Sequence, residues 1–170
     1  MMQHAISLFP YHSPCGTLLI ASYEGQICLC DWEINRHRQQ TDYRICRALN
    51  AQYVKQTSEV INQACVELDE YFQGNRATFS VPLLMAIGTP FQHRVWQCLA
   101  QVPYGTTISY AEEARRLGNA AAVRAVASAN GANPLSILVP CHRVISSHGT
   151  LGGYAGGLSA KRFLLDLETS

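Results

Sequence analysis

The stretch ILVPCHRVI, residues 137–145, constrains the fold more than any other part of this 170-residue sequence. Its apolar residues predict a short buried β-strand, and Pro140 marks the end of that strand because proline cannot donate to a sheet ladder. A thiol, an imidazole and a guanidinium follow directly, in Cys141, His142 and Arg143. Reactive groups at the end of a buried strand meet a cleft, so this segment predicts a chemical site.

The neighbours of Cys141 give this site its chemical character. A buried cysteine is usually an inert small hydrophobe, but the positive charges of His142 and Arg143 favour thiolate over thiol. Adjacent side chains on an extended chain point in opposite directions, so we expect a turn or one water to connect Cys141 with His142. The imidazole needs a third group to fix its tautomer. Asp166 and Glu168 are the acidic residues that follow, and spacing alone does not choose between them.

The charge balance changes along the chain. Residues 1–85 hold six Lys and Arg against eight Asp and Glu, whereas residues 86–170 hold seven against four. The basic excess therefore lies in the half that contains the cysteine motif. It is too small to predict nucleic-acid binding alone, but it permits a local phosphate-facing patch. We expect one domain at 1–85 and a second at 86–170.

The first half predicts a small antiparallel sheet with a helix. Three β-rich runs, HAISLFPYHS, GTLLIASYEG and QICLCDWEI, are separated by short turns and predict a meander. Residues 57–74 predict an amphipathic helix that Thr57 or Ser58 caps. The segment 35–42 is polar and ambiguous, and 77–88 predicts a strand that leads into a linker.

The second half predicts mostly helix. A helix at 89–102 begins with a threonine N-cap and a proline in the first helical position. Two short helices at 109–118 and 120–132 are joined by a tight turn, as in a helix-turn-helix. Small residues dominate the second of them apart from Arg124, and small residues let a helix approach a protein core or a DNA groove closely. A last helix is expected at 159–168.

The second half resembles the catalytic domain of the O6-alkylguanine-DNA alkyltransferases over residues 88–168. The shared pieces are GTPFQHRVW, VPYGTTISY, AAVRAVASANGANP, ILVPCHRVI, GTLGGYAGG and KRFLLDLE, in family order and spacing. The first half resembles the family's sheet domain only diffusely. The resemblance implies an α+β fold, with a small antiparallel sheet and helix followed by a mostly helical domain. That domain is expected to hold the helix-turn-helix and a short strand that carries the reactive cysteine.

The resemblance also implies roles for single residues. Cys141 falls at the position of the alkyl acceptor and His142 at that of its water-linked base. Glu168, rather than Asp166, falls at the position of the carboxylate that orients this base. Asn133 matches the residue that braces the turn before the cysteine segment.

The remaining implied roles concern DNA and the base pocket. Tyr110 matches a tyrosine that stabilises the flipped nucleotide and donates a proton to the leaving guanine. Arg124 matches the finger that fills the gap in the duplex, and Ser109 and Ala125 are further expected DNA contacts. The pocket is expected to be formed by Val144, Tyr154, Ala155 and Gly156, with Lys161 supporting its loop.

The implied activity is direct repair of O6-alkylguanine and O4-alkylthymine. The helix-turn-helix would bind the minor groove of double-stranded DNA, and the flipped base would lose its alkyl group irreversibly to Cys141. We expect a monomer without cofactor or metal. Some relatives carry zinc in the first domain, but Tyr23 and Cys28 stand at two of those ligand positions, and tyrosine is a poor substitute.

Two other functions fit parts of the sequence. A module that binds alkylated bases without transfer would not need Cys141, which is present. A cysteine hydrolase could use Cys141 and His142, but this function leaves the helix-turn-helix unexplained.

Cysteine usage predicts the compartment. Seven cysteines, with no basic segment and long apolar run at the start, favour a reducing cytoplasm over a disulfide framework. No apolar run approaches the roughly 20 residues of a transmembrane helix. We expect a cytoplasmic protein without membrane association, on the nucleoid when bound to DNA, or nuclear in a eukaryote.

Overall fold

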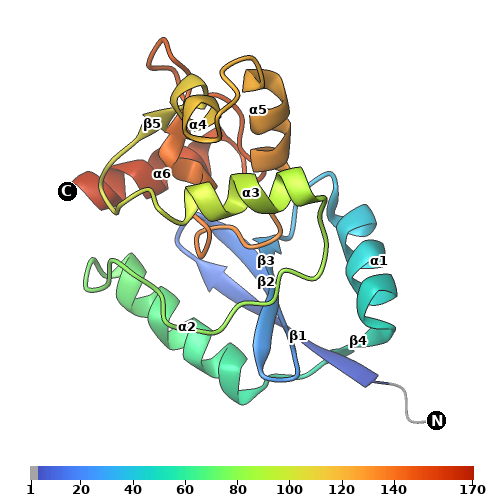
Figure 1. The fold of residues 1–170 in the computed structure, drawn as a ribbon. Coiled ribbons are helices and arrows are strands. Elements are labelled where there is room, and N and C mark those ends of the chain that lie inside the picture. The colour runs from blue at the N-terminus through green and yellow to red at the C-terminus, as the bar shows by residue number, and fades with distance from the viewer. Residues whose placement is uncertain (1–3) are drawn as a thin grey trace. The chain divides into compact units, whose positions relative to one another are not determined.

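The computed structural model describes residues 4–170, which belong to two compact units that meet in sequence between Ile87 and Gly88 (Figure 1). An N-terminal sheet with antiparallel strand pairs and a largely helical C-terminal unit confirm the α+β class. Among residues 4–170, no helix combines the length and the apolar character needed to cross a membrane.

The N-terminal sheet has four strands in the order β3-β2-β1-β4. The first three form the expected antiparallel meander. The fourth pairs in parallel with β1, so the sheet is mixed rather than purely antiparallel. Only Ala51 of this fourth strand is buried, and its sequence AQYVK lacks the strict alternation that predicts a strand. The strands are β1 (His4–Ser13), β2 (Gly16–Tyr23), β3 (Gln26–Trp32) and β4 (Ala51–Lys55).

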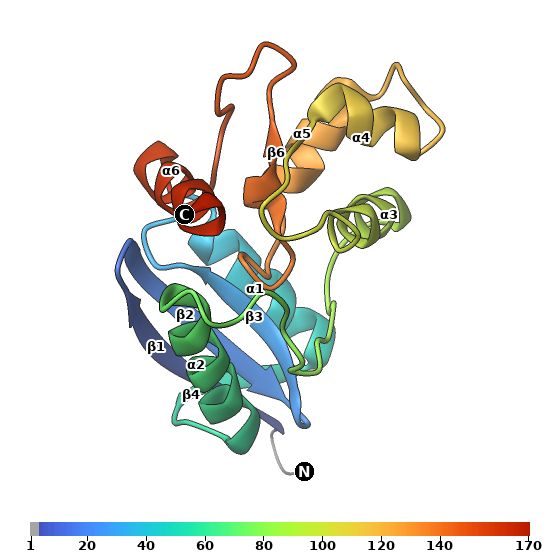
Figure 2. The same cartoon turned by 90° about the vertical axis from the view of Figure 1, so that its left-hand side faces the viewer.

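Two helices cover the two faces of this sheet (Figure 2). Helix α2 (Glu59–Phe72) confirms the predicted amphipathic helix, and the Ser58 side chain caps it by accepting a hydrogen bond from the Ile61 backbone N–H. Helix α1 (Arg38–Leu49) covers most of the segment that the sequence leaves undefined. It has no side-chain cap and buries only Ile45, so its sequence carries little helical pattern.

The strand expected at residues 77–88 is wrong. One isolated bridge joins Leu83 to Ile27, and the segment is otherwise irregular. The carboxylate of Glu67 instead accepts hydrogen bonds from the backbone N–H and hydroxyl of Ser80, at 2.7 and 2.8 Å. A side chain therefore satisfies a backbone N–H that a sheet ladder would otherwise pair.

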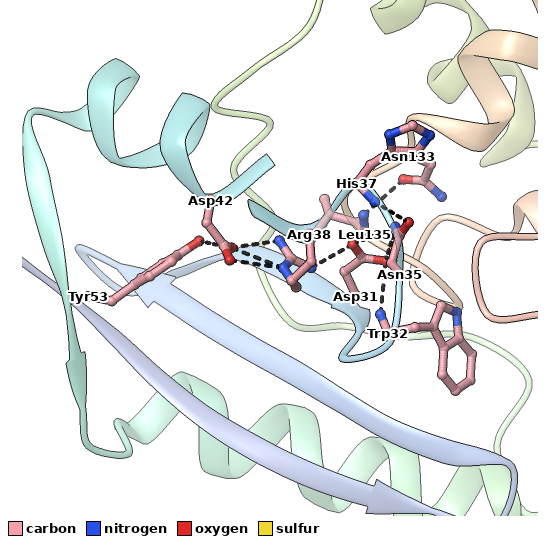
Figure 3. Close-up of polar contacts among 9 residues, drawn as sticks. All are labelled: Asp31, Trp32, Asn35, His37, Arg38, Asp42, Tyr53, Asn133 and Leu135. Carbon is pink, nitrogen blue, oxygen red and sulfur yellow. Dashed lines mark hydrogen bonds and ion pairs between the residues drawn. The ribbon is translucent and has the colours of Figure 1, made fainter. Parts of the chain in front are cut away.

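An ionic network links β3, α1 and β4 (Figure 3). Arg38 Nη1 lies 2.5 Å from Asp31 Oδ2, and Arg38 Nη2 lies 2.7 Å from Asp42 Oδ1. The hydroxyl of Tyr53 donates to the same Asp42 oxygen at 2.7 Å. Burial raises the pKa of Asp31 despite the positive charge of Arg38. The network therefore holds a carboxylate that depends on its arginine.

Removing that arginine should destabilise the N-terminal unit. Arg38→Met leaves the buried Asp31 without its counter-charge, and we expect a loss of about 3–5 kcal/mol in the free energy of unfolding. The double variant Asp31→Asn with Arg38→Met should recover a substantial part of this loss, because no unpaired charge remains. Urea denaturation at neutral pH measures both, with the exposed Arg44→Met as control. Equal losses for Arg38→Met and Arg44→Met contradict the prediction.

The C-terminal unit confirms the helices predicted from the sequence. The N-cap Thr89 forms a full capping box with Gln92. The two helices of the expected helix-turn-helix pack against each other, but residues 117–122 separate them rather than a two-residue turn. The elements are α3 (Pro90–Leu99), β5 (Ile108–Ser109), α4 (Tyr110–Arg116), α5 (Val123–Gly131), β6 (Val144–Ile145) and α6 (Leu158–Thr169), and β5 pairs in parallel with β6.

Candidate active site

The cysteine does not lie on a strand. Residues Cys141–Arg143 form one turn of 3-10 helix directly before β6. The apolar residues before them are buried as expected, but they form a turn held by local hydrogen bonds, such as Val139 N–H to Leu135 C=O at 2.8 Å. The predicted strand is therefore wrong, because a buried turn and a buried strand have the same apolar composition.

The side chain of Asn133 bridges the two ends of this turn by hydrogen bonds to its backbone. Its Nδ2 donates to the Val139 carbonyl and its Oδ1 accepts from the Leu135 N–H, both at 2.9 Å. Ile137, between them, has a φ of 71°, a left-handed conformation that costs a β-branched residue about 1–3 kcal/mol. The two bonds of Asn133 offset this strain and fix the backbone that leads to Cys141.

His142 is completely buried and bound to Glu168. Its Nε2 lies 2.7 Å from Glu168 Oε2. Because a carboxylate only accepts, we place the imidazole proton on Nε2, which leaves Nδ1 as a base. This Nδ1 is buried and has no hydrogen-bond partner among residues 4–170. Burial lowers the pKa of His142 although Glu168 opposes the shift, so the ring is neutral at neutral pH.

Glu168 is the centre of a larger buried cluster. Arg143 donates to it twice, Nε to Oε1 at 2.8 Å and Nη2 to Oε2 at 3.1 Å. The Gly105 backbone N–H adds a contact of 3.3 Å, and Arg143 Nη1 also donates to the Val102 carbonyl at 2.8 Å. Asp166 lies exposed on the same helix. Sequence reasoning placed the charge of Arg143 beside the thiol and missed that it is paired with Glu168.

Lys161 organises the glycine-rich loop. Its buried Nζ donates to the carbonyls of Val144 at 2.8 Å and Gly153 at 3.1 Å, and to that of Leu151. Tyr110 Oη lies 3.5 Å from the same nitrogen. Burial lowers the pKa of Lys161 to about 8, with an opposing contribution from Cys141. The lysine thus joins β6, the loop and α4.

Comparison with known proteins identifies the family. Residues 90–170 match the model of the 6-O-methylguanine DNA methyltransferase DNA-binding domain, and residues 10–85 match that of its ribonuclease-like domain. The chain is 41% identical to a methylated-DNA--protein-cysteine methyltransferase of Haemophilus influenzae, over 93% of this chain and 83% of that relative. It belongs to the 6-O-methylguanine DNA methyltransferase family.

Further comparisons support this membership. A constitutive methylated-DNA--protein-cysteine methyltransferase of Bacillus subtilis is 42% identical over 92% of this chain and 91% of the relative. The crystal structure of Mycobacterium tuberculosis O6-methylguanine methyltransferase superposes with a TM-score of 0.81 at 37% identity, covering 96% and 93% of the two chains. The same enzyme in complex with DNA gives 0.82 at 37% identity, covering 96% and 92%.

Other residues suggested by the family resemblance lie on α5, in the glycine-rich loop and on β6. Arg124 and Ala125 are exposed neighbours on α5. Tyr154, Ala155 and Gly156 are half-buried in the glycine-rich loop, while Val144 is buried at the start of β6. Within residues 4–170, no three His, Cys, Asp or Glu side chains are grouped so that they could hold a metal ion.

Tyr110 follows the N-cap residue of α4, Ser109, and its ring lies against Gly152. It is the first residue of α4, where the Ser109 hydroxyl accepts from the Glu112 N–H at 3.0 Å. A Cβ added to Gly152, whose φ is 71°, would lie 2.9 Å from both Cε2 and Oη of Tyr110. Burial raises the pKa of Tyr110 to about 12, so the hydroxyl keeps its proton. Sequence reasoning missed Gly152, whose place in a glycine-dense stretch was its only signal.

Substitution of Gly152 tests this contact in the methyltransferase. Gly152→Ala should displace the Tyr110 ring and slow the reaction with free O6-benzylguanine at least tenfold. A tenfold loss corresponds to an increase of about 1.4 kcal/mol in the activation free energy. Gly153→Ala is a matched control with open space around its Cβ. Gly149→Ala shares the left-handed φ but contacts nothing, so it separates backbone strain from steric displacement. Similar rates for all three variants contradict the proposed contact.

Proposed function

We propose that this protein repairs alkylated DNA by transferring the alkyl group irreversibly to its own Cys141. The observation that carries this proposal is the buried His142, with Nε2 committed to Glu168 and Nδ1 left as an unfilled base next to the cysteine in sequence. Relatives named methylated-DNA--protein-cysteine methyltransferases and the DNA complex of the M. tuberculosis enzyme support it. The proposal assigns residues 86–170 to DNA binding and alkyl acceptance, and residues 1–85 to a separate domain.

The first step is activation of the thiol. The Cys141 proton passes through one water to His142 Nδ1, and Glu168 stabilises the imidazolium that forms. A buried nitrogen without a partner is the kind of group that binds such a water. The thiolate then attacks the alkyl carbon of the flipped base, so that an S–C bond forms as the C–O bond breaks.

The second step is departure of the base. The electron pair of the broken bond leaves on the guanine oxygen, and the Tyr110 hydroxyl donates to the departing base. The Lys161 ammonium, 3.5 Å from that hydroxyl, stabilises the negative charge that develops nearby. The product is a thioether, which water does not readily cleave, so each molecule acts once. O4-alkylthymine offers the same alkyl–oxygen bond to the thiolate.

Access to the base requires that it leave the duplex. Arg124 and Ala125 project from the exposed side of α5, where small neighbours allow the helix to approach the minor groove. Flipping costs a few kcal/mol of stacking and pairing. In this proposal the Arg124 guanidinium occupies the space that the base leaves, and a single protein molecule acts on each lesion.

The acceptor assignment predicts a mass change. Wild-type protein incubated with methylated duplex DNA should gain the mass of one CH2 group, because a methyl group replaces the thiol hydrogen. Cys141→Ser should gain none, because a hydroxyl is a far weaker acid and nucleophile. Cys98→Ser should behave as wild type. Intact-mass spectrometry with peptide mapping measures this result. Binding without a mass gain would indicate a non-transferring module, and a protein that neither binds the DNA nor gains mass would leave the hydrolase as the alternative.

The role of Arg124 predicts a difference between two substrates. Arg124→Ala should slow repair of duplex DNA at least tenfold more than reaction with free O6-benzylguanine, which needs no flipping. Arg124→Lys should restore the salt dependence of duplex binding but only part of the rate, because an ammonium does not stack like a guanidinium. Second-order rate constants on both substrates decide the matter. Equal losses would mean that Arg124 supports the fold or the pocket.

A further inference from the structure

The C-terminal unit buries a carboxyl group that the alkyl-transfer site does not use. Glu113, on α4, is 0% exposed. Its Oε2 accepts a hydrogen bond of 2.9 Å from Nδ2 of Asn130, on α5. The other two polar atoms of the pair, Glu113 Oε1 and Asn130 Oδ1, are buried and have no hydrogen-bond partner among residues 4–170.

These two leftover atoms complement each other in only one protonation state. A carboxylate and an amide oxygen both accept, so an ionised Glu113 leaves Oε1 and Asn130 Oδ1 without a donor, and the buried charge keeps only the Asn130 amide as a donor. A protonated carboxyl has one O–H to give, and Asn130 Oδ1 is the unfilled acceptor in the same pair. Burying a neutral acid that is hydrogen-bonded costs far less than burying an unpaired charge.

The surroundings supply no full counter-charge. Helix α4 packs against α3, α5, β5 and β6. Glu113 interacts electrostatically with Cys98 of α3 and with Tyr110 and Arg116 of its own helix. Helix α5 contributes the amide of Asn130, and the residues of β5 and β6 are not titratable. Arg116 is partly exposed and binds Glu112 at 3.1 Å. Burial raises the pKa of Glu113 to about 7, against the lowering effects of Asn130 and Arg116.

The pair joins the two helices that carry the proposed DNA-contacting residues. Glu113 lies one turn after Tyr110 on α4, and Asn130 lies on the helix of Arg124. The neighbouring bond from Trp96 Nε1 of α3 to the Ala129 carbonyl of α5, at 2.9 Å, involves no titratable group. The Glu113–Asn130 pair is therefore a link between α4 and α5 that pH can change.

We propose that Glu113 is a neutral carboxylic acid in the folded protein and donates a hydrogen bond to Asn130 Oδ1. This reciprocal acid–amide pair positions α4 against α5. Ionisation removes the donor and leaves a buried charge, so the helix pair loosens and its hold on duplex DNA weakens as the pH rises. Only this DNA-binding half rests on the function proposed above. Glu113 is a positioning residue, since it acts through Asn130 and the packing of α4 against α5.

The first test is the pH dependence of stability. The folded state holds the proton of Glu113 more tightly than the unfolded chain, so its stabilisation is complete in acid and is lost as the pH rises towards about 7. Glu113→Gln offers an amide N–H to Asn130 at every pH and should lack this loss. Between about pH 5 and pH 8, the folding equilibrium constant of wild type should fall relative to Glu113→Gln by on the order of a hundredfold.

Denaturant unfolding of the full chain measures this difference, with Glu112→Gln, at the partly exposed neighbouring position, as matched control. Glu112→Gln should follow wild type. Parallel stability curves for wild type and Glu113→Gln overturn the proposal whether or not the protein transfers alkyl groups. If Glu113→Gln fails to fold, carbon-13 NMR of glutamate-labelled wild type still decides. One glutamate carboxyl should titrate near neutral pH, and the absence of such a carboxyl overturns the proposal.

The second test addresses DNA. Two proteins are compared, Cys141→Ser and the double variant Cys141→Ser with Glu113→Gln. Between about pH 6 and 8, the dissociation constant for duplex DNA should rise in the single variant by a factor more than tenfold larger than in the double variant. Equal pH dependence of binding, together with the expected stability difference, overturns the DNA-binding half and leaves the acid–amide pair. If neither protein binds duplex DNA, the proposed function is refuted, and the acid–amide pair is not.

Discussion

The buried carboxylate of Glu168 is the interaction on which the C-terminal unit depends. It joins the last helix to the turn at Gly105 and to the 3-10 turn of the cysteine through four hydrogen-bond contacts. A buried ion that loses a partner costs about 3–5 kcal/mol. Loss of any partner therefore destabilises the unit strongly, and the complete cluster orients the ring of His142. One carboxylate thus meets a structural and a chemical requirement.

The pairing with Arg143 also decides how charge changes during activation. Arg143 and Glu168 cancel each other, so a neutral His142 and a thiol make the resting cluster neutral overall. Moving the proton from Cys141 to His142 creates one anion and one cation together, and the net charge of the buried group is unchanged. Charge separation over a short distance costs less than creating one unpaired charge in a low-dielectric site. Without Arg143, the Glu168 carboxylate would instead draw a proton onto His142 in the resting state.

The sequence predicted features that local chemistry determines and missed those that depend on packing. The helices α2, α3 and α6, which each bury several residues along one face, were predicted close to their observed bounds with or without a side-chain cap, whereas α1, which buries only Ile45, was not. The apolar run before Cys141 was mistaken for a strand, because burial alone does not distinguish a ladder from a turn. Spacing could not choose Glu168 over Asp166; the family resemblance chose it, and the fold buries that residue against His142. The contacts of Arg143 and Gly152 lie far apart in sequence and left no local pattern.

Among the buried glutamates of residues 4–170, the charge state follows the number of donors around the carboxyl group. Glu67 accepts from Gln63 and Ser80, and although burial alone would raise its pKa, these bonds and the charge of Arg76 hold the pKa below its ordinary value. Glu168 accepts hydrogen bonds from Arg143 and from further donors, which stabilise its anionic form. Glu113 has a single amide donor, and its pKa is raised by burial. The same side chain therefore serves as a fixed charge where donors surround it and as a titratable acid where one donor faces it.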